Sequence, residues 1–224
     1  MKLKIVMLGV LIISYLSLKA QSLQGEKAVT HFYNVNLDDG ILDLFSSVKI
    51  DNKISEPTNK KVTNEFTANI IDTFYTIASA KLREELGLEL LPLSELHSKI
   101  KYSRKYPNCP DMVNIKKVLK NASGYQYYAD FFVNVYSDFP QNAENLSPDK
   151  IKPLYAISFS LYNAKGETVE KIEFSFRSKE VMANEGNQDL TIKGQQLKLN
   201  LCKNYSEALN GFSTICKKKL TAQL

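Results

Sequence analysis

The segment 102–112, YSRKYPNCPDM, holds the densest group of side chains that could do chemistry. Arg104 and Lys105 carry positive charge, and Tyr102 and Tyr106 flank them with aromatic rings. Cations among aromatic rings suit phosphates and stacked bases, so a nucleic-acid patch can have this pattern. A loop that touches anionic lipid or glycan can have it too. The two prolines and the asparagine favour a third interpretation, a plain surface loop that connects two elements.

The cysteines and histidines are the next candidates for a site. In an oxidising compartment Cys109, Cys202 and Cys216 would allow one disulfide and leave one thiol over. The pair Cys202–Cys216 closes the shortest loop, so it is the candidate disulfide. No C-x-x-C spacing occurs, and His31 and His97 lie far away in sequence, so we expect no metal site.

Sequence motifs of known enzymes are missing from the chain. There is no glycine-rich phosphate loop, no nucleophile elbow and no H-E-x-x-H zinc motif. His31 fits a structural or surface position in a strand. His97 has Ser94 and Glu95 nearby in sequence, but this spacing alone does not make a catalytic triad. We therefore expect no catalytic residue and no cofactor.

The first twenty residues are arranged like a secretory signal. Lys2 and Lys4 precede an apolar run from Ile5 to Leu16, and Ala20 precedes Gln21. The run is too short to cross a bilayer, which takes about 20 apolar residues. We expect a signal peptide over 1–20 and a single extracytoplasmic domain over 21–224, periplasmic or secreted, with no transmembrane segment in the mature chain.

The charge of the chain changes when that leader is removed. The full chain has 29 Lys and Arg against 24 Asp and Glu. The leader contains Lys2, Lys4 and Lys19 and no acidic residue, which leaves 26 basic residues against 24 acidic ones. A nearly neutral protein attracts polyanions weakly over distance, so we expect no nucleic-acid partner.

Helical spacing of apolar residues indicates three helices. The clearest spans 64–86, with Thr63 or Asn64 as its cap and Gly87 as its stop. "LELLPL" then predicts a short buried strand. The other two helices are expected over 111–120 and 205–220.

Strict alternation of apolar and polar residues predicts three consecutive strands. They span Tyr127–Phe139, Leu154–Tyr162 and Thr168–Arg177, and the last two are joined by a turn at "NAKG". Alternation of this kind indicates a sheet with one covered face and one wet face. Two earlier strands are expected near Thr30–Leu37 and Phe45–Ile50, and the polar segments 51–61, 140–152 and 178–194 are expected to be loops.

The order of these elements predicts a single α/β domain of the mixed α+β kind. An early β–α–β unit is followed by a three-strand antiparallel meander, with helices packed on a mixed sheet.

Three stretches resemble one family of bacterial envelope proteins: "FYTIASAKLREELGLELLPLSEL", "YYADFFVNVYSDF" and "LYNAKGETVEKIEF". They are similar to the helix-to-strand step, the strand and the hairpin of the periplasmic domain found in the curli secretion channel protein and in activator lipoproteins of penicillin-binding proteins. The amino-terminal domain of the Tol translocation protein is built similarly. The resemblance covers about Phe66 to Phe176 and implies assembly or partner binding without catalytic residues. This chain lacks the lipoprotein cysteine of many members, so tethering to the membrane is not implied.

Together these observations predict a non-enzymatic exported envelope protein that binds another envelope protein or an assembly. The expected contact surface is either the wet sheet face, with Asn134, Tyr136, Tyr162 and Arg177, or the basic loop, with Tyr102, Arg104, Lys105 and Tyr106. One alternative is a small-molecule or glycan binder with a cleft lined by tyrosines. A hydrolase that uses His97 is the less favoured one.

Overall fold

The computed structural model describes residues 23–46, 49–50, 53–54, 60–96, 98–100, 114–138, 151–182 and 190–222. Its centre is a five-stranded sheet in the order β4-β1-β5-β6-β7. The strands span Glu89–Leu90 (β4), Lys27–Leu37 (β1), Tyr127–Asp138 (β5), Lys152–Asn163 (β6) and Thr168–Arg177 (β7). β1 is parallel to both of its neighbours, and β5, β6 and β7 form an antiparallel meander. The predicted mixed sheet of a single α+β domain is confirmed.

The early β–α–β unit consists of β1, the helix α3 (Lys60–Leu86) and β4. One side of α3 buries Ile70, Phe74, Ala78 and Leu82, as the helical spacing predicts. The helix stops at Gly87, whose φ of 70° suits a residue without a side chain. The predicted start was wrong, because the helix begins at Lys60 and runs through both expected capping residues.

The last helix, α5, spans Leu190–Ala222 and is longer than the predicted 205–220. Leu197 and Leu201 are buried and extend the apolar stripe toward the N-terminus of the helix. The predicted loop 178–194 is therefore wrong over 190–194. The polar residues and Gly194 weaken the helical pattern over 190–194. The helix still includes this segment, because packing of the apolar stripe that starts at Leu197 stabilises the whole helix.

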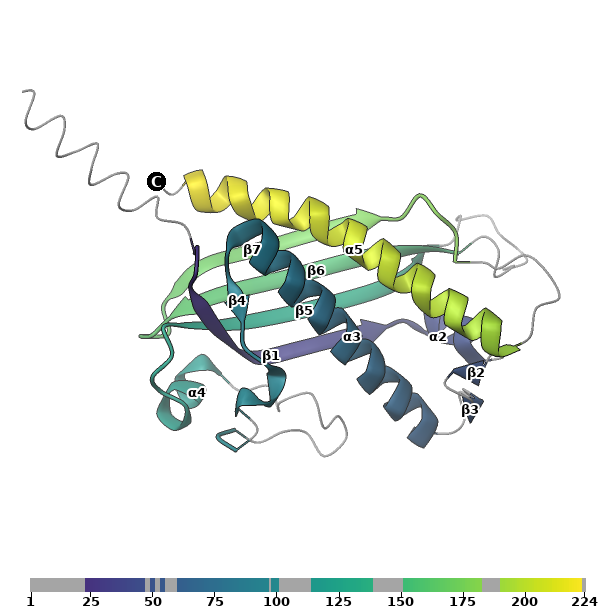
Figure 1. Ribbon diagram of the computed structural model, residues 1–224, viewed down its shortest axis with the longest axis horizontal. Coiled ribbons are helices and arrows are strands. Elements are labelled where there is room, and N and C mark those ends of the chain that lie inside the picture. Colours follow the sequence, from purple (N-terminus) through teal and green to yellow (C-terminus); the bar gives the residue numbers. More distant parts are fainter. Residues whose placement is uncertain are drawn as a thin grey trace, which may run out of the picture.

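α3 and α5 lie side by side on one face of the sheet (Figure 1). Phe74 of α3 stacks on Tyr205 of α5 with ring centroids 4.0 Å apart. Phe131 of β5 and Phe212 of α5 meet edge to face at 5.7 Å. We call this helix-covered side of the sheet the inner face and the opposite side the outer face.

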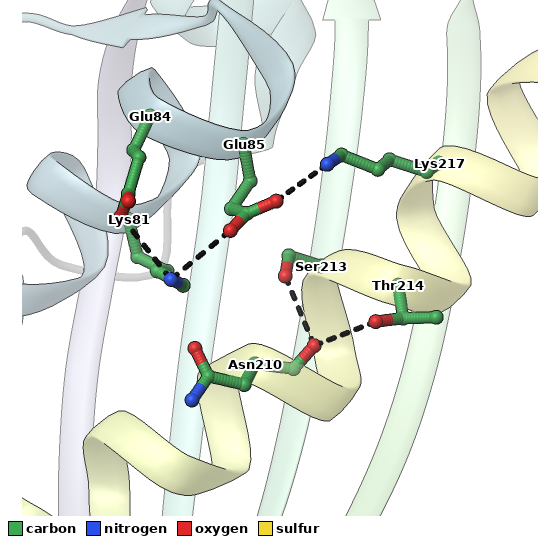
Figure 2. A network of polar contacts seen from close by, with 7 residues as sticks. All are labelled: Lys81, Glu84, Glu85, Asn210, Ser213, Thr214 and Lys217. Carbon is green, nitrogen blue, oxygen red and sulfur yellow. Dashed lines mark hydrogen bonds and ion pairs between the residues drawn. The ribbon is translucent and has the colours of Figure 1, made fainter.

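A polar network joins the same two helices at the surface (Figure 2). Lys217 of α5 donates a hydrogen bond to Glu85 of α3, and Lys81 lies 3.1 Å from both Glu84 and Glu85. The hydrogen bond from Lys217 lowers the pKa of the Glu85 carboxyl, and the hydrogen bond from Lys81 lowers it by a smaller amount. The two cations thus keep Glu85 ionised while they connect α3 to α5.

The segment after β1 differs from the prediction of a strand over 45–50. A helix, α2, spans Asp39–Ser46, and β2 (Lys49–Ile50) pairs with β3 (Lys53–Ile54) in a separate two-stranded sheet. Asp38 caps α2, because its carboxylate accepts a hydrogen bond from the amide of Ile41 at 2.8 Å. β3 lies within the predicted loop 51–61, so that prediction was wrong there too.

One end of the outer face carries a second, smaller core. The short 3-10 helix η1 (Leu93–Leu96) and α4 (Ile115–Asn121) supply Leu96 and Val118, which pack with Val29 and Tyr128. α4 begins at Ile115 and not at 111, since the Asn114 side chain caps it by accepting from the amide of Lys116 at 2.9 Å.

Candidate functional site

Four of the predicted contact residues lie on the outer face, where β5, β6 and β7 present every second side chain. Asn134 and Tyr136 come from β5, Tyr162 from β6 and Arg177 from β7. Their neighbours Val133, Val135 and Leu161 face inward and are buried. The other four, Tyr102, Arg104, Lys105 and Tyr106, lie outside the described residues, as does His97.

β6 presents only small side chains to the middle of the outer face: Ala156, Ser158 and Ser160. These residues form the floor of a recess. A hollow of about 570 Å³ lies over the two serines, and a second of about 270 Å³ lies over Ala156 and Ser158. Both hollows are lined by Ser158 and by Phe132 of β5. We call these two neighbouring hollows together the β6 trough.

A β-bulge places His31 at one end of the β6 trough. The register between β1 and β5 shifts between Thr30 and Phe32. Thr30 turns inward, where its hydroxyl lies 2.8 Å from the hydroxyl of Tyr75, while His31 and Phe32 both line the larger hollow. A bulge inserts one residue and so lets two consecutive side chains share a face.

The imidazole of His31 is only 2% exposed and faces an acid. Its Nε2 lies 2.7 Å from Oδ1 of Asp130, although the pair does not have the alignment of a good hydrogen bond. Its Nδ1 has no hydrogen-bond partner among the described residues. The ring meets Tyr162 edge to face, with centroids 5.9 Å apart.

Tyr162 completes this polar end of the trough. Its hydroxyl donates to Oδ2 of Asp130 at 3.0 Å. Burial, and next the negative charge of Asp130, raise the pKa of Tyr162, while a hydrogen bond with Ser160 acts in the opposite direction. The phenol therefore stays neutral and remains a donor at neutral pH.

An aromatic wall stands beside these polar groups. Phe32 and Phe132 stack at 6.1 Å between centroids with an interplanar angle of 21°. Phe132 separates the Asp130 end of the trough from Asn134, which accepts from the Asn36 side chain at 3.3 Å. The trough thus combines polar groups, apolar ring surface and small floor residues.

The arrangement does not provide an activated nucleophile among the described residues. Nε2 of His31 is directed to Asp130 and its Nδ1 is without a partner, so neither serine of the floor is paired with the imidazole. A nucleophile and its base must lie within hydrogen-bond reach. The described residues also contain no group of three His, Cys, Asp or Glu that could hold a metal ion.

The remaining predicted contact residues lie at the far end of the outer face. Tyr136 is 40% exposed, and its row across the sheet continues through Leu154 to Arg177. Nε of Arg177 lies 2.7 Å from Oδ2 of Asp138. Sequence alternation predicted this face but gave no reason to pair His31 with Asp130, so the pairing was missed.

The predicted Cys202–Cys216 disulfide is wrong. Both cysteines are free and lie on α5, fourteen positions apart along one helix. A helical rise of about 1.5 Å per residue separates them by about 21 Å, whereas a disulfide needs Cα atoms within about 7 Å. Burial raises the pKa of the Cys202 thiol and raises that of Cys216 to about 12. Cys109 lies outside the described residues.

A hollow of about 680 Å³ lies between α3 and β4. Several of its polar groups already serve the fold. The Tyr75 hydroxyl donates to the carbonyl of Leu91, and the Ser79 hydroxyl lies 3.4 Å from the carbonyl of Leu90.

Comparisons with known proteins give distant structural similarity and no named family. No family model matches the chain, and no curated protein matches it. A solved structure from Helicobacter pylori, described as a neuraminyllactose-binding hemagglutinin homolog, is 9% identical with a TM-score of 0.41 and covers 89% of each chain. The hypothetical protein CT253 from Chlamydia trachomatis is 11% identical with a TM-score of 0.29, over 82% of this chain and 98% of that one. Within the described residues, no helix is long and apolar enough to cross a membrane.

Proposed function

We propose that this chain is a non-enzymatic exported protein of the bacterial envelope, which holds a segment of another envelope protein in the β6 trough. The observation that carries the proposal is the trough itself. It lies on the face opposite α3 and α5, and its floor of Ala156, Ser158 and Ser160 is lower than Phe132 beside it.

The dimensions of the trough suit an extended polypeptide. Residues Ala156 to Ser160 cover four steps of β6, or about 13 Å at the usual rise of about 3.3 Å per residue. An extended segment of about four residues has the same length. Its backbone could bond with the serine hydroxyls, and one of its apolar side chains could pack on Phe132.

The side chains around the trough are of the kinds that protein interfaces favour. Phe32 and Phe132 supply aromatic surface in the trough, and Tyr136 and Arg177, which Asp138 holds, lie beyond it on the same face. Aromatic residues and arginine are enriched at interfaces and among the residues that dominate binding energy. The lack of a paired nucleophile among the described residues favours binding over catalysis.

The exported location and the type of partner are part of this proposal. They rest on the signal-like residues 1–20 and on the resemblance to the periplasmic domains of the curli secretion channel protein, the penicillin-binding-protein activators and the Tol amino-terminal domain. Members of that family bind or assemble envelope proteins, so we expect the partner to be one.

Filling the trough tests the proposal. Ser158→Trp places a large ring on the floor, and tryptophan is well tolerated in strands. We expect this variant to lose at least tenfold in retention of envelope proteins that wild type captures from an envelope extract, with an unchanged melting temperature. Thr214→Trp on the exposed side of α5 is the matched control and should bind like wild type. Equal retention by Ser158→Trp and wild type would refute the proposal.

A second candidate function is the binding of a small glycan in the hollow over Ser158 and Ser160. Its volume of about 570 Å³ lies in the usual range for small-ligand sites, about 300 to 1,000 Å³. Asp130 and Tyr162 offer an acceptor and a donor beside the Phe32 ring. The carboxylate favours neutral hydroxyl-rich sugars over acidic ones. Calorimetric titration with neutral and acidic oligosaccharides tests this, and binding by Asp130→Asn equal to wild type would contradict it.

A further inference from the structure

The strand β7 forms one edge of the described sheet, since β6 is its single neighbour there. The amide of Ser178 donates to the carbonyl of Pro153 at the start of β6. Alternate residues of an antiparallel strand direct their backbone groups to opposite sides. Even-numbered residues near the end of β7 therefore bond to β6, and the backbone groups of Glu173, Ser175 and Arg177 point to the free edge.

The first half of this edge is closed by side chains of the same chain. The amide of Lys171 donates to Oε1 of Glu170 at 3.1 Å, and Nζ of Lys219 donates to the carbonyl of Lys171 at 3.1 Å. These contacts occupy the positions that a neighbouring strand would use, which is a common protection of edges. Within the part of the chain that the structure describes, the unpaired part of the β7 edge therefore begins at Glu173.

We propose that a second copy of this chain pairs with β7 in antiparallel fashion along Glu173–Arg177, with the two-fold axis at Ser175. This joins two five-stranded sheets across one interface, and each copy contributes the same surface. The larger hollow of the β6 trough has no β7 residue in its lining and stays open on both copies, whereas Glu173 and Ser175 border the smaller hollow, so the dimer would lie beside that end of the trough.

Charge complementarity selects the second copy and the register. With the axis at Ser175, Glu173 of each copy lies opposite Arg177 of the other. The two side chains are 71% and 65% exposed, and within one chain Glu173 lies 2.9 Å from Lys171 and Arg177 lies 2.7 Å from Asp138 of β5. Pairing across the edge therefore requires Arg177 to share Asp138 with, or exchange it for, Glu173 of the other copy. On the inner face, Phe174 lies opposite Phe176, and aromatic cross-strand pairs stabilise sheets.

Other registers are less favourable. An axis at Glu173 places that residue opposite itself, and an axis at Phe174 places Lys171 opposite Arg177. An axis at Ile172 pairs Lys171 with Glu173, but it requires the backbone of Lys171, which is already occupied. Like charges directly opposite one another destabilise a sheet.

The interface is short, so we expect a weak dimer. The proposed pairing along Glu173–Arg177 covers five residues per copy, which is less than the roughly 20 to 30 residues per side of a standard stable interface. Dimerisation should therefore depend on concentration and on salt, because exposed charge pairs are screened.

Charge-sorted variants test the proposal by sedimentation velocity over a concentration series. Arg177→Glu gives two acids that face two acids, and Glu173→Arg gives two cations that face two cations. Each variant alone should dimerise at least tenfold more weakly than wild type. Mixed in equal amounts they should form a heterodimer, since both pairs become complementary. Lys116→Glu on α4 changes an exposed cation elsewhere and should dimerise like wild type.

Ser175→Cys provides an independent measurement. Directly opposite, hydrogen-bonded residues of antiparallel strands have Cα atoms about 5.5 Å apart, a separation that a disulfide accepts. Mild oxidation should link this variant into dimers beyond the background that wild type shows from its own cysteines. A monomeric wild type at the highest concentration, homodimers of either charge variant as strong as wild type, or no heterodimer in the mixture would overturn the proposal.

Discussion

The two faces of the sheet differ in how their side chains pack. On the inner face, Phe131 and Phe159 of neighbouring strands pack against Phe212 of α5, and all three are buried. On the outer face, the neighbouring positions Phe132 and Ser158 border a depression. The same strands thus hold a close-packed core on one side and a recessed surface on the other.

If the outer face binds a partner as proposed, the residues that stabilise the fold and those that bind lie on opposite faces of the sheet. Close packing is sensitive to the loss of a few methylene groups, because the surrounding side chains cannot collapse into the space. A recessed surface is already in contact with solvent and loses little when a side chain is shortened. Substitutions on the inner face should therefore mainly lower stability, and substitutions on the outer face should mainly weaken the proposed binding.

The largest expected effect comes from adjacent phenylalanines. Phe131→Ala removes a buried ring that contacts Tyr33, Phe159 and Phe212, and should lower the free energy of unfolding by about 3 to 5 kcal/mol. Phe132→Ala on the outer face should cost about 1 kcal/mol, since that ring is only half-buried. Urea unfolding of both variants measures the difference. Similar losses would mean that the outer face is also a packed core.

Gly25 and Gly87 are close in space, and alanine substitutions at the two positions distinguish the cost of backbone strain from the cost of a steric clash. The amide of Gly25 donates to the carbonyl of Gly87 at 2.9 Å, and both residues have positive φ, 79° and 70°. A Cβ at Gly87 would lie 2.7 Å from Cα of Gln24, whereas one at Gly25 would meet nothing within 4 Å. Gly87→Ala should therefore cost about 3 kcal/mol and Gly25→Ala about 1 kcal/mol. Thermal unfolding tests the order, and the reverse order would contradict this account.

Tyr128 of β5 and Tyr162 of β6 lie opposite one another. Tyr128 belongs to the small core and Tyr162 to the trough, so substitutions at the two positions compare these regions. Tyr128 is fully buried and donates to the carbonyl of Ala122 at 2.7 Å. Tyr162 is half-buried and donates to Asp130. Tyr128→Phe should cost about 1 to 2 kcal/mol, because it leaves a buried carbonyl unpaired, and Tyr162→Phe less than about 1 kcal/mol. Chemical denaturation decides, and a larger loss for Tyr162→Phe would show that the trough stabilises the fold.

The smallest expected effect is the acid dependence of the network between α3 and α5. The pKa of Glu85 is below its ordinary value of 4.5, so its contribution is present above that value and is lost as the pH falls through the folded pKa. Lys217→Gln removes the main cause of the shift. The stability difference between wild type and this variant should shrink from pH 6 to pH 3, and high salt should shrink it as well. Urea midpoints across this range measure it; a constant difference would contradict the assignment.

The inner face could be predicted from the sequence in detail. Alternation in β5, β6 and β7 identified the buried residues, and helical spacing did so for much of α3 and α5. These patterns are local, since a strand repeats every two residues and a helix every 3.6. The start of α5 was missed because Gly194 and its polar neighbours obscure the stripe.

The candidate site was only partly predictable. Tyr162 was assigned to the outer face correctly, but His31 and Asp130 are about a hundred positions apart in the sequence and meet only through the parallel pairing of β1 with β5. The cysteine prediction was wrong for the opposite reason. A short separation along the chain suggested a bridge, but the helix holds the two thiols apart.

The sequence by itself determined the class of fold and the two faces of the meander, because both follow from the spacing of apolar residues along the chain. Only the tertiary structure decided the β6 trough, the bulge that turns His31 outward, and the open end of the β7 edge. Each of these depends on which residues of different strands lie opposite one another. Register of that kind is set by the packing of the whole sheet and cannot be derived from any single segment.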